Sequence, residues 1–331
     1  MDKKIVVHTG AGPNDPLVEE SKALSQPDIL FIKRGKCRTP QEVLEAIRDA
    51  DVALCMSEPY TREVLSQVLK LKAVIRYGVG VDTIDLEAAT EYGIVVAHFP
   101  DFCIPEVADH ALMLLLACAR KLLRIDHTLR TQGWNAARAM RSPIGPLHGE
   151  TLGLIAFGNI ARAVAKRGQC LGMKVIAYDP YVDAAVFQEH DIESVSLEEL
   201  AARSDYVSCH VPLNRHTRGL IDAAFFERMK PTAYFVNTSR GPVVKEADLI
   251  AALQTGRIAG AGLDVYETEP LPPDSPLLSM DNVVLTPHMG SFADETYAKR
   301  DRRVGLNAVT LARGGLPEFV ANPAVLNHRR V

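Results

Sequence analysis

The chain has 331 residues, of which 47% are hydrophobic and 24% are charged, and its formal net charge is −4. This composition is ordinary for a folded globular protein, and the length favours two domains over a single core. Because nucleic acids and anionic membranes bind basic surfaces, the slight negative charge argues against both as partners.

The N-terminus and the cysteines bear on the cellular compartment. The chain begins MDKKIVVHTGAG, with two lysines but only a three-residue apolar run, which does not fit a signal peptide. The longest apolar stretch, ALMLLLACA at 111–119, is less than half of a membrane span and favours a buried helix. Six scattered cysteines are interpreted as small buried hydrophobic residues in a reducing compartment. We expect a cytoplasmic protein without a membrane partner.

Strand-like and helix-like segments alternate through the first hundred residues. The apolar runs are IVVHT, DILFI, DVALCM, AVIRY and IVVAHF. Among the helical segments between them is TPQEVLEAIRDA, where Thr39 can cap a helix, Pro40 suits its first position and Glu42 completes a capping box. Strands that are apolar on both faces and joined by helices predict a parallel sheet covered on both sides.

The alternation stops at PDFCIPEVADHALMLLLACARKLLRIDHTLRTQGW, residues 100–134, which have the pattern of one long helix. The middle of this helix is hydrophobic almost all round. Such a helix suits a connection between two domains, and burial at a subunit interface would account for its apolar surface. An irregular segment with Pro143 and Pro146 is expected to follow it.

From residue 151 the alternation resumes. Strands are expected at GLIAF, KVIAYD, YVSCHV, AYFVNT, AGLDV and NVVLTPH. The helix pattern SLEELAARS carries a second capping box, Ser196 with Glu199. A second parallel sheet of roughly six strands is the size expected of a doubly wound dinucleotide-binding domain. A last helix is expected at about 292–313.

A glycine turn opens this second half. In TLGLIAFGNIARAVAKRG, the dinucleotide pattern G-x-G-x-x-G/A occurs with Ala156 in place of its first glycine. Gly158 would let the backbone approach a pyrophosphate, and the amides of Asn159 and Ile160 would open a helix whose positive end faces it. We expect Ala156 to be tolerated because its methyl group fits a backbone with negative φ.

An acidic residue lies about twenty positions further on, where VIAYDPY ends the next strand at Asp179. A carboxylate there accepts hydrogen bonds from the adenosine ribose hydroxyls and repels a 2′-phosphate, which favours NAD over NADP. By itself this pair of signals leaves an ordinary strand-turn-helix open. The earlier segment VVHTGAGPND, with Gly10 and Gly12, has no such acidic partner and is interpreted as a plain loop.

Three later segments, FVNTSRGPVV, GLDVYETEP and VVLTPHMGS, each end an apolar strand with polar residues. Because the carboxyl ends of parallel strands border the ligand crevice, Arg240, Glu269 and His288 should meet there. Arginine can hold a carboxylate, histidine can exchange a proton near neutral pH, and a carboxylate beside histidine favours its protonated form. Taken singly, Arg240 could cap a loop, Glu269 could be a solvated charge and His288 could be a histidine of the core. The three residues together favour a catalytic site.

The motifs AFGNIA, YDP, CHVPL, NTSRG, LDVYETEP and TPHMGS, in this order, resemble the D-isomer-specific 2-hydroxyacid dehydrogenases. The resemblance begins at RYGVGVDTIDLEAA, and it is nearest to phosphoglycerate dehydrogenase and the dehydrogenase-like C-terminal binding proteins. It implies an α/β fold of two doubly wound parallel-sheet domains: a Rossmann NAD-binding domain, 101–290, inserted into a flavodoxin-like substrate domain, 1–100 and 291–331. It also implies a homodimer through the helix after residue 103.

The resemblance also implies roles for individual residues. Arg240 would bind the substrate carboxylate and the C2 oxygen, His288 would be the general acid/base, and Glu269 would be its partner. The cofactor would be bound by Gly158, Asn159, Ile160, Asp179, His210, Val211, Pro212, Thr217, Thr238 and Asp264, the last near the nicotinamide. The substrate would be bound by Arg76, Gly78, Val79, Gly80 and His98. No metal is expected.

Two of the substrate residues leave the substrate open. His98 stands where the family commonly has asparagine, and Arg76 is either a ligand of a substrate phosphate or a solvated charge. The function indicated is an NAD-dependent D-2-hydroxyacid dehydrogenase, or 2-keto acid reductase, acting on a small acid. The alternatives are an NADH-responsive binding protein with little turnover and a phosphite dehydrogenase with the same three residues. A formate dehydrogenase is disfavoured, because it would have glutamine in place of Glu269.

Overall fold

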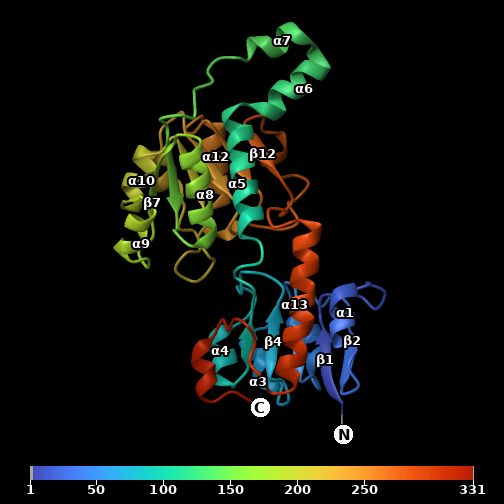
Figure 1. The fold of residues 1–331 in the computed structure, drawn as a ribbon. Helices are drawn as coiled ribbons and strands as arrows, with labels where there is room; N and C mark the ends of the chain where they lie inside the picture. Colours follow the sequence, from blue (N-terminus) through green and yellow to red (C-terminus); the bar gives the residue numbers. More distant parts are fainter. Residues whose placement is uncertain (1–2, 331) are drawn as a thin grey trace. The chain divides into compact units, whose positions relative to one another are not determined.

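A computed structural model describes residues 3–330 of the chain (Figure 1). The chain divides into two compact units. One comprises the residues up to Phe102 together with those from Ala293 onward, and the other is Cys103–Phe292. The sequence placed the boundaries at 100/101 and 290/291, two residues earlier in each case.

The first unit contains a five-stranded parallel sheet in the order β2-β1-β3-β4-β5. This is the flavodoxin-like strand order, so the predicted fold class of this unit is confirmed. The strands are β1 (Lys4–His8), β2 (Ile29–Lys33), β3 (Val52–Cys55), β4 (Ala73–Arg76) and β5 (Val95–Ala97). The helices are α1 (Val18–Leu24), α2 (Pro40–Ile47), α3 (Arg62–Gln67), α4 (Leu86–Glu91) and α13 (Asp294–Ala312), with a short 3₁₀ turn, η3 (Pro323–Asn327).

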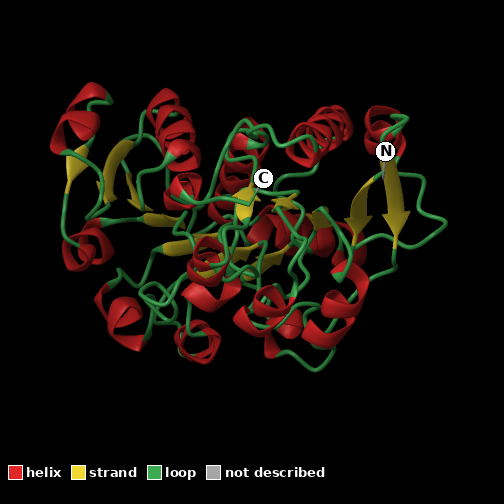
Figure 2. Ribbon diagram, turned by 90° about the horizontal axis from the view of Figure 1, so that it is seen from below, coloured by secondary structure: helices red, strands yellow, loops and turns green. Residues whose placement is uncertain are grey.

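Helices cover both faces of this sheet, as the two-sided apolar strands predict (Figure 2). Alternate residues of β1 separate the two cores: Val7 packs in the cluster that contains α2, α3 and α4, and Val6 packs in the cluster that contains α1 and α13. The predicted cap of α2 is confirmed, since the Thr39 hydroxyl accepts the amide of Glu42 and the Glu42 carboxylate accepts the amide of Thr39.

The second unit contains a seven-stranded parallel sheet in the order β12-β11-β10-β9-β6-β7-β8. The strands are β6 (Thr151–Ile155), β7 (Lys174–Tyr178), β8 (Glu193–Ser194), β9 (Tyr206–Cys209), β10 (Tyr234–Asn237), β11 (Gly260–Leu263) and β12 (Val283–Leu285). The strand missing from the sequence interpretation is β8, whose two exposed polar residues give no apolar run. Counted from β6, the order is that of a Rossmann domain, and the order reverses between β6 and β9, where such sheets bind ligands.

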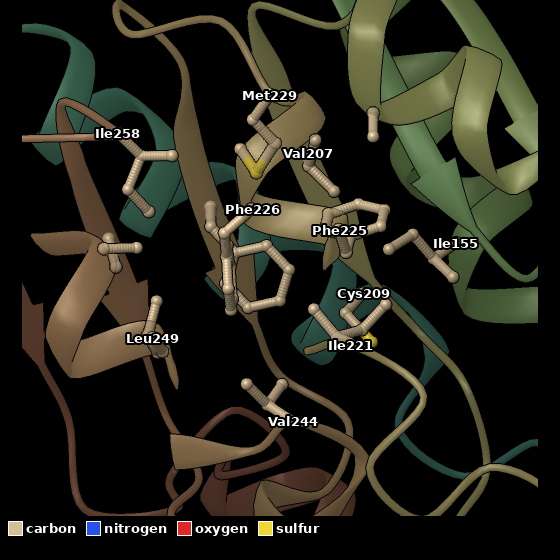
Figure 3. Packing of buried hydrophobic residues seen from close by; sticks show 14 of the residues in the cluster. Ile155, Val207, Cys209, Ile221, Phe225, Phe226, Met229, Val244, Leu249 and Ile258 are labelled. Carbon is tan, nitrogen blue, oxygen red and sulfur yellow. The ribbon is translucent and has the colours of Figure 1, made fainter. Parts of the chain in front are cut away.

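Helices also cover both faces of the second sheet. One core cluster contains α5 (Ile104–Ala119) and α8 (Asn159–Cys170), and the other contains α10 (Leu197–Arg203), α11 (Ala223–Arg228) and α12 (Glu246–Gln254). The helix α9 (Ala184–Glu189) lies beside β8. The unit also has two 3₁₀ turns, η1 (Gly241–Val243) and η2 (Pro276–Ser279). Figure 3 shows Phe225 and Phe226 of α11 packed with Leu249 of α12 among the side chains of the central strands. On the opposite face α5 lies so close to β11 that a Cβ atom at Gly262 would be 2.9 Å from that of Leu114.

The prediction of one continuous helix over residues 100–134 is wrong. The chain forms three helices here, α5, α6 (Leu122–Gln132) and α7 (Trp134–Ala139), and α7 extends into the segment expected to be irregular. Lys121, with φ 52°, breaks the first two helices apart, and Gly133, with φ 84°, separates α6 from α7. Hydrophobic periodicity continues across Lys121, so it does not reveal a single residue in the left-handed region. Figure 1 shows α6 and α7 projecting beyond the end of α5, away from the sheet of their own unit.

Two findings concern membrane-spanning helices and the cysteines. Within residues 3–330, no helix combines the length and the apolar character needed to cross a bilayer. Four cysteines are buried, but Cys37 is half-buried and Cys170 is exposed at the end of α8. The interpretation of all six as buried hydrophobic residues is therefore wrong for these two.

Candidate active site

The glycine turn between β6 and α8 differs from expectation at Ala156. Its φ is 74°, so the prediction of a negative φ is wrong. The amide of Ala156 donates to the carbonyl of Tyr178 at 2.8 Å, which ties the turn to the end of β7. The first position of this turn requires the left-handed conformation that glycine ordinarily supplies, and alanine adopts it at a steric cost of about 1–2 kcal/mol. Gly158 is exposed, and a Cβ atom there would have no neighbour within 4 Å, so the approach to the first turn of α8 is open.

Asp179 lies at the end of β7, beside this turn. One carboxylate oxygen accepts the amide of Phe157 and the other accepts the amide of Tyr181, each at 2.9 Å. Each oxygen has a further lone pair, so the carboxylate can also accept hydroxyl groups of a ligand. The structure thus places a fixed negative charge next to the turn, at the position where the sequence predicts the ribose of a dinucleotide.

The loop after β9 carries four of the predicted cofactor residues. Nε2 of His210 lies 2.9 Å from the hydroxyl of Ser208, and burial lowers the pKa of His210 to about 4, so the imidazole is neutral. The Thr217 hydroxyl donates to the carbonyl of Pro212 at 2.6 Å and so closes the loop that follows Val211. These side chains fix the shape of the loop, and their contacts with a cofactor remain predictions.

Thr238, just after β10, has a different character. Its hydroxyl is buried and has no hydrogen-bond partner within the described part of the chain. A buried polar atom without a partner costs free energy unless water or a ligand satisfies it. Together with the open turn at Gly158 and the carboxylate of Asp179, this hydroxyl fits a polar ligand that runs along the carboxyl ends of β6, β7 and β10.

His288 and Glu269 form the pair that the sequence predicts. Nδ1 of His288 lies 2.7 Å from Oε2 of Glu269, and the other carboxylate oxygen accepts the amide of Tyr266 at 3.1 Å. Burial favours a raised pKa of Glu269, but the hydrogen bond and charge of His288, the Tyr266 amide and the charge of Arg240 lower it overall. The carboxylate is therefore an acceptor, so Nδ1 of His288 donates to it and Nε2 is left to exchange a proton.

Arg240 lies in the loop between β10 and η1. Its guanidinium donates to the carbonyl of Ser239 at 2.8 Å, and the amide group of Asn237 donates to the carbonyl of Arg240 at 3.2 Å. The next residue must be glycine, because a Cβ atom at Gly241 would lie 1.7 Å from the carbonyl oxygen of Tyr266. This close approach brings the Arg240 loop against the loop that carries Glu269. Asn237, buried and shaping the loop, was not found from the sequence, although it is part of the NTSRG motif.

Asp264 is 2% exposed and holds the loop of His288. Its carboxylate accepts the Thr286 hydroxyl at 2.6 Å and the amides of Met289 and Gly290, each at 2.8 Å. Burial favours a raised pKa of Asp264, but hydrogen bonds from His110, Thr286 and the two amides lower it overall, so the group is ionised. Its side chain is thus committed to the protein, and the predicted contact with a nicotinamide stays a prediction.

The predicted substrate residues lie together in the first unit, at the carboxyl ends of β4 and β5. Nδ1 of His98 is 2.9 Å from the carbonyl oxygen of Val79. The half-buried side chain of Arg76 runs next to Gly78, where a Cβ atom would be 3.4 Å from the guanidinium. His98 and Arg76 therefore flank the loop Gly78–Gly80, for which the family resemblance implies binding of a substrate carboxylate.

The second unit thus has the properties of a dinucleotide-dependent oxidoreductase. Its sheet has Rossmann order, an open glycine turn precedes a helix N-terminus at the switch point, and a His–Glu pair with a nearby arginine lies at successive strand ends. These features define the class of protein but not the reaction.

Comparison with known proteins gives the family. The model for the NAD binding domain of D-isomer specific 2-hydroxyacid dehydrogenases matches residues 112–290. A glyoxylate reductase of Korarchaeum cryptofilum is 40% identical over 289 residues, 87% of either chain. A D-3-phosphoglycerate dehydrogenase of Methanocaldococcus jannaschii is 40% identical over 93% of this chain and 58% of its own length. A solved NADPH-dependent glyoxylate/hydroxypyruvate reductase of Sinorhizobium meliloti has a TM-score of 0.85 at 28% identity, covering 100% of this chain and 99% of that one.

The chain belongs to the D-isomer-specific 2-hydroxyacid dehydrogenase family, as its motifs predict. Its second unit is accordingly the nicotinamide dinucleotide-binding domain of such an oxidoreductase.

Proposed function

We propose that this protein is an NADH-dependent reductase of small 2-keto acids that also runs in reverse as a D-2-hydroxyacid dehydrogenase. The observation that carries the proposal is the 2.7 Å contact between His288 and an ionised Glu269, with Arg240 on the adjoining loop. A proton donor, its counter-ion and a carboxylate-binding cation are the groups that reduction of a keto acid requires. The printed names of two relatives, a glyoxylate reductase and a D-3-phosphoglycerate dehydrogenase, support this substrate class.

The residues that would hold the dinucleotide are the turn at Gly158, Asn159 and Ile160, the carboxylate of Asp179 and the buried hydroxyl of Thr238. When bound, the nicotinamide supplies the hydride. The carboxylate of Asp179 would repel a 2′-phosphate, which supports NADH over NADPH as the preferred cofactor.

The protein supplies the proton and the positioning. Arg240 holds the substrate carboxylate and the C2 oxygen in a forked geometry. Protonated His288 donates from Nε2 to that oxygen as negative charge develops on it, while Glu269 stays ionised and stabilises the imidazolium. In the oxidation direction, neutral Nε2 accepts the hydroxyl proton. Most of the acceleration on the protein side comes from positioning and charge stabilisation.

The loop of the first unit bears on the choice of acid. We assign carboxylate binding to the backbone amides of Gly78, Val79 and Gly80. Arg76, which lies beside Gly78, favours a substrate with a second anionic group. His98 replaces the usual asparagine, and its contact with the Val79 carbonyl makes it a determinant of the loop's conformation.

A panel of keto acids tests the proposal. Glyoxylate, pyruvate, hydroxypyruvate and phosphohydroxypyruvate are each offered with NADH and with NADPH, and oxidation of the cofactor is followed. Turnover with any of these keto acids supports the reductase. Phosphite is offered with NAD as a separate assay, and turnover in that assay without turnover of any keto acid supports the phosphite dehydrogenase instead. Tight NADH binding without turnover on the whole panel overturns the proposal in favour of a binding protein.

We also propose that the protein forms a homodimer through α6 and α7. Leu122, Leu123, Leu129 and Trp134 are 57%, 53%, 42% and 66% exposed, an apolar surface that a second copy would cover. A cavity of about 580 Å³, lined in part by Leu123, Tyr206 and Tyr234, continues this surface. Light scattering after size exclusion tests the state, and Leu122→Asp with Trp134→Asp should produce a monomer; a wild-type monomer overturns the proposal.

A further inference from the structure

The loop of His288 is held by a chain of hydrogen bonds that begins on α5. Nε2 of His110 lies 2.9 Å from the Thr286 hydroxyl and 3.3 Å from Oδ1 of Asp264. The Thr286 hydroxyl donates to the same Oδ1 at 2.6 Å, and the amide of Met289 donates to it at 2.8 Å. His110 side-chain exposure is only 14%, and that of Asp264 is 2%, so water competes little for these bonds.

Counting protons fixes the role of His110 in this chain. Thr286 has one hydroxyl proton, which goes to the ionised carboxylate of Asp264. The Thr286 oxygen can therefore only accept at its contact with His110, so Nε2 of His110 carries the proton and donates. Removing this donor leaves the half-buried hydroxyl oxygen of Thr286 and the buried carboxylate of Asp264 each short of one hydrogen bond, which disfavours their present arrangement.

The loop that these groups hold needs an anchor. His288 itself has φ 54°, a left-handed conformation that its side chain disfavours. Its amide donates to the carbonyl of Asp264, and the amide of Gly290 donates to Oδ2 of the same residue. Gly290 packs closely against the same carboxylate, because a Cβ atom there would be 2.9 Å from that Oδ2. The backbone of His288 and the two residues after it is thus held by bonds to Asp264, while the imidazole itself contacts Glu269.

We propose that His110 is a positioning residue for catalysis: through Thr286 and Asp264 it fixes the loop that presents His288 to the substrate. This inference rests on the proposed function, since it assigns the proton donor to His288. It adds a residue that touches neither substrate nor cofactor and lies 176 positions before Thr286 in the chain.

Two isosteric variants test the proposal. His110→Leu and Thr286→Val each remove one member of the chain while keeping similar volume. Each should lower kcat by about 10- to 100-fold, because a displacement of the order of 1 Å at a catalytic group costs that much. The dissociation constant for NADH should stay within about twofold, since His288 contributes to the proton transfer step. The double variant should lose about as much as either single variant, because both changes break the same chain of bonds.

Rescue and controls separate positioning from general stability. His110→Gln keeps a donor at a similar reach, and Thr286→Ser keeps the hydroxyl, so both should retain most of kcat. Thr151→Val, at the first residue of β6 and therefore at the opposite end of that strand from the glycine turn, should leave kcat unchanged. Amide hydrogen exchange should accelerate at Met289 and Gly290 in the two isosteric variants and stay unchanged in β6 and α8.

The outcomes distinguish the two proposals. Amide exchange does not depend on substrate, so it tests whether His110 and Thr286 hold the loop of His288 even if no keto acid is reduced. If exchange accelerates as expected but no keto acid is reduced, only the proposed function fails. Wild-type kcat together with wild-type exchange in His110→Leu overturns the positioning role. Faster exchange throughout the second unit, with equal losses of kcat and NADH affinity, also overturns it. If His110→Leu does not fold, the same readouts on Thr286→Val decide.

Discussion

Replacing Ala156 by glycine should stabilise the protein or leave its stability unchanged, which is the reverse of the usual effect. With φ at 74°, Ala156 bears a steric cost of about 1–2 kcal/mol that glycine does not. Glycine in turn gives the unfolded chain more freedom, at a cost of about 0.4–1 kcal/mol. Taken at the middle of each range, the difference is a gain of roughly 0.8 kcal/mol in the free energy of unfolding. If φ were negative, only the greater freedom of the unfolded chain would act, and the glycine variant would be less stable by about 0.4–1 kcal/mol.

Native-state amide exchange measures this difference without mixing the two units. The slowest amides of β6 and β7, which flank the turn, report the free energy of opening the second unit alone. Ala163→Gly on α8 is the matched control, since glycine in a helix interior should cost about 1 kcal/mol. Ala156→Val completes the series, because a β-branched residue is strongly disfavoured at positive φ.

The expected order of stability is therefore glycine at or above alanine, and alanine above valine. An Ala156→Gly variant that is less stable than the wild type, by as much as Ala163→Gly, would refute the left-handed assignment. Such a result would restore the sequence-based expectation of a negative φ, with its methyl group accommodated at the turn.

Four further outcomes follow from the site. His288→Gln should bind NADH normally and lose about 10²–10⁴-fold in kcat, as measured by stopped-flow and steady-state assays, and near-normal turnover would contradict its role as the acid. Asp179→Asn, which keeps an acceptor for the Phe157 amide, should raise the ratio of kcat/KM for NADPH to that for NADH by about tenfold or more; an unchanged ratio contradicts the proposed discrimination. Gly241→Ala should abolish folding of the second unit, as measured by circular dichroism, or abolish activity in the keto acid assay if the unit still folds, since the added atom would overlap the Tyr266 carbonyl. A folded variant with wild-type activity would contradict this. Because the pKa of Glu269 is lowered in the folded protein, its contribution to stability is present above its ordinary value of 4.5 and is lost as the pH falls below that value through the folded pKa. Glu269→Gln should therefore flatten the pH dependence of urea denaturation below the ordinary value of 4.5, and identical profiles would contradict this.

Much of the fold follows from local patterns in the sequence. Apolar runs of four or five residues between helical segments predict strands covered on both faces, and the caps at Thr39 and Ser196 mark helix starts that the structure reproduces. The meeting of Glu269 and His288 also follows from the sequence, since each ends a strand of one parallel sheet and such ends share an edge. These features depend on residues within a few positions of one another or on the rules of sheet topology.

Other features depend on contacts that no local pattern contains. The left-handed backbone of Lys121 lies inside an unbroken helical pattern, and that of Ala156 occurs at a residue type that ordinarily disfavours positive φ. The requirement for glycine at 241 comes from the carbonyl of Tyr266, on a different strand end.

The amino-acid sequence by itself determined the two parallel sheets, the family and the chemical types gathered at the strand ends, because these follow from periodicity, turn chemistry and motif order. Only the tertiary structure decided how His288, the proposed proton donor, is held. His110 and Thr286 are 176 residues apart, and their hydrogen bond forms because α5 packs across β11 and β12. Periodicity places His110 on a helix, but only packing between distant segments gives its nitrogen an acceptor.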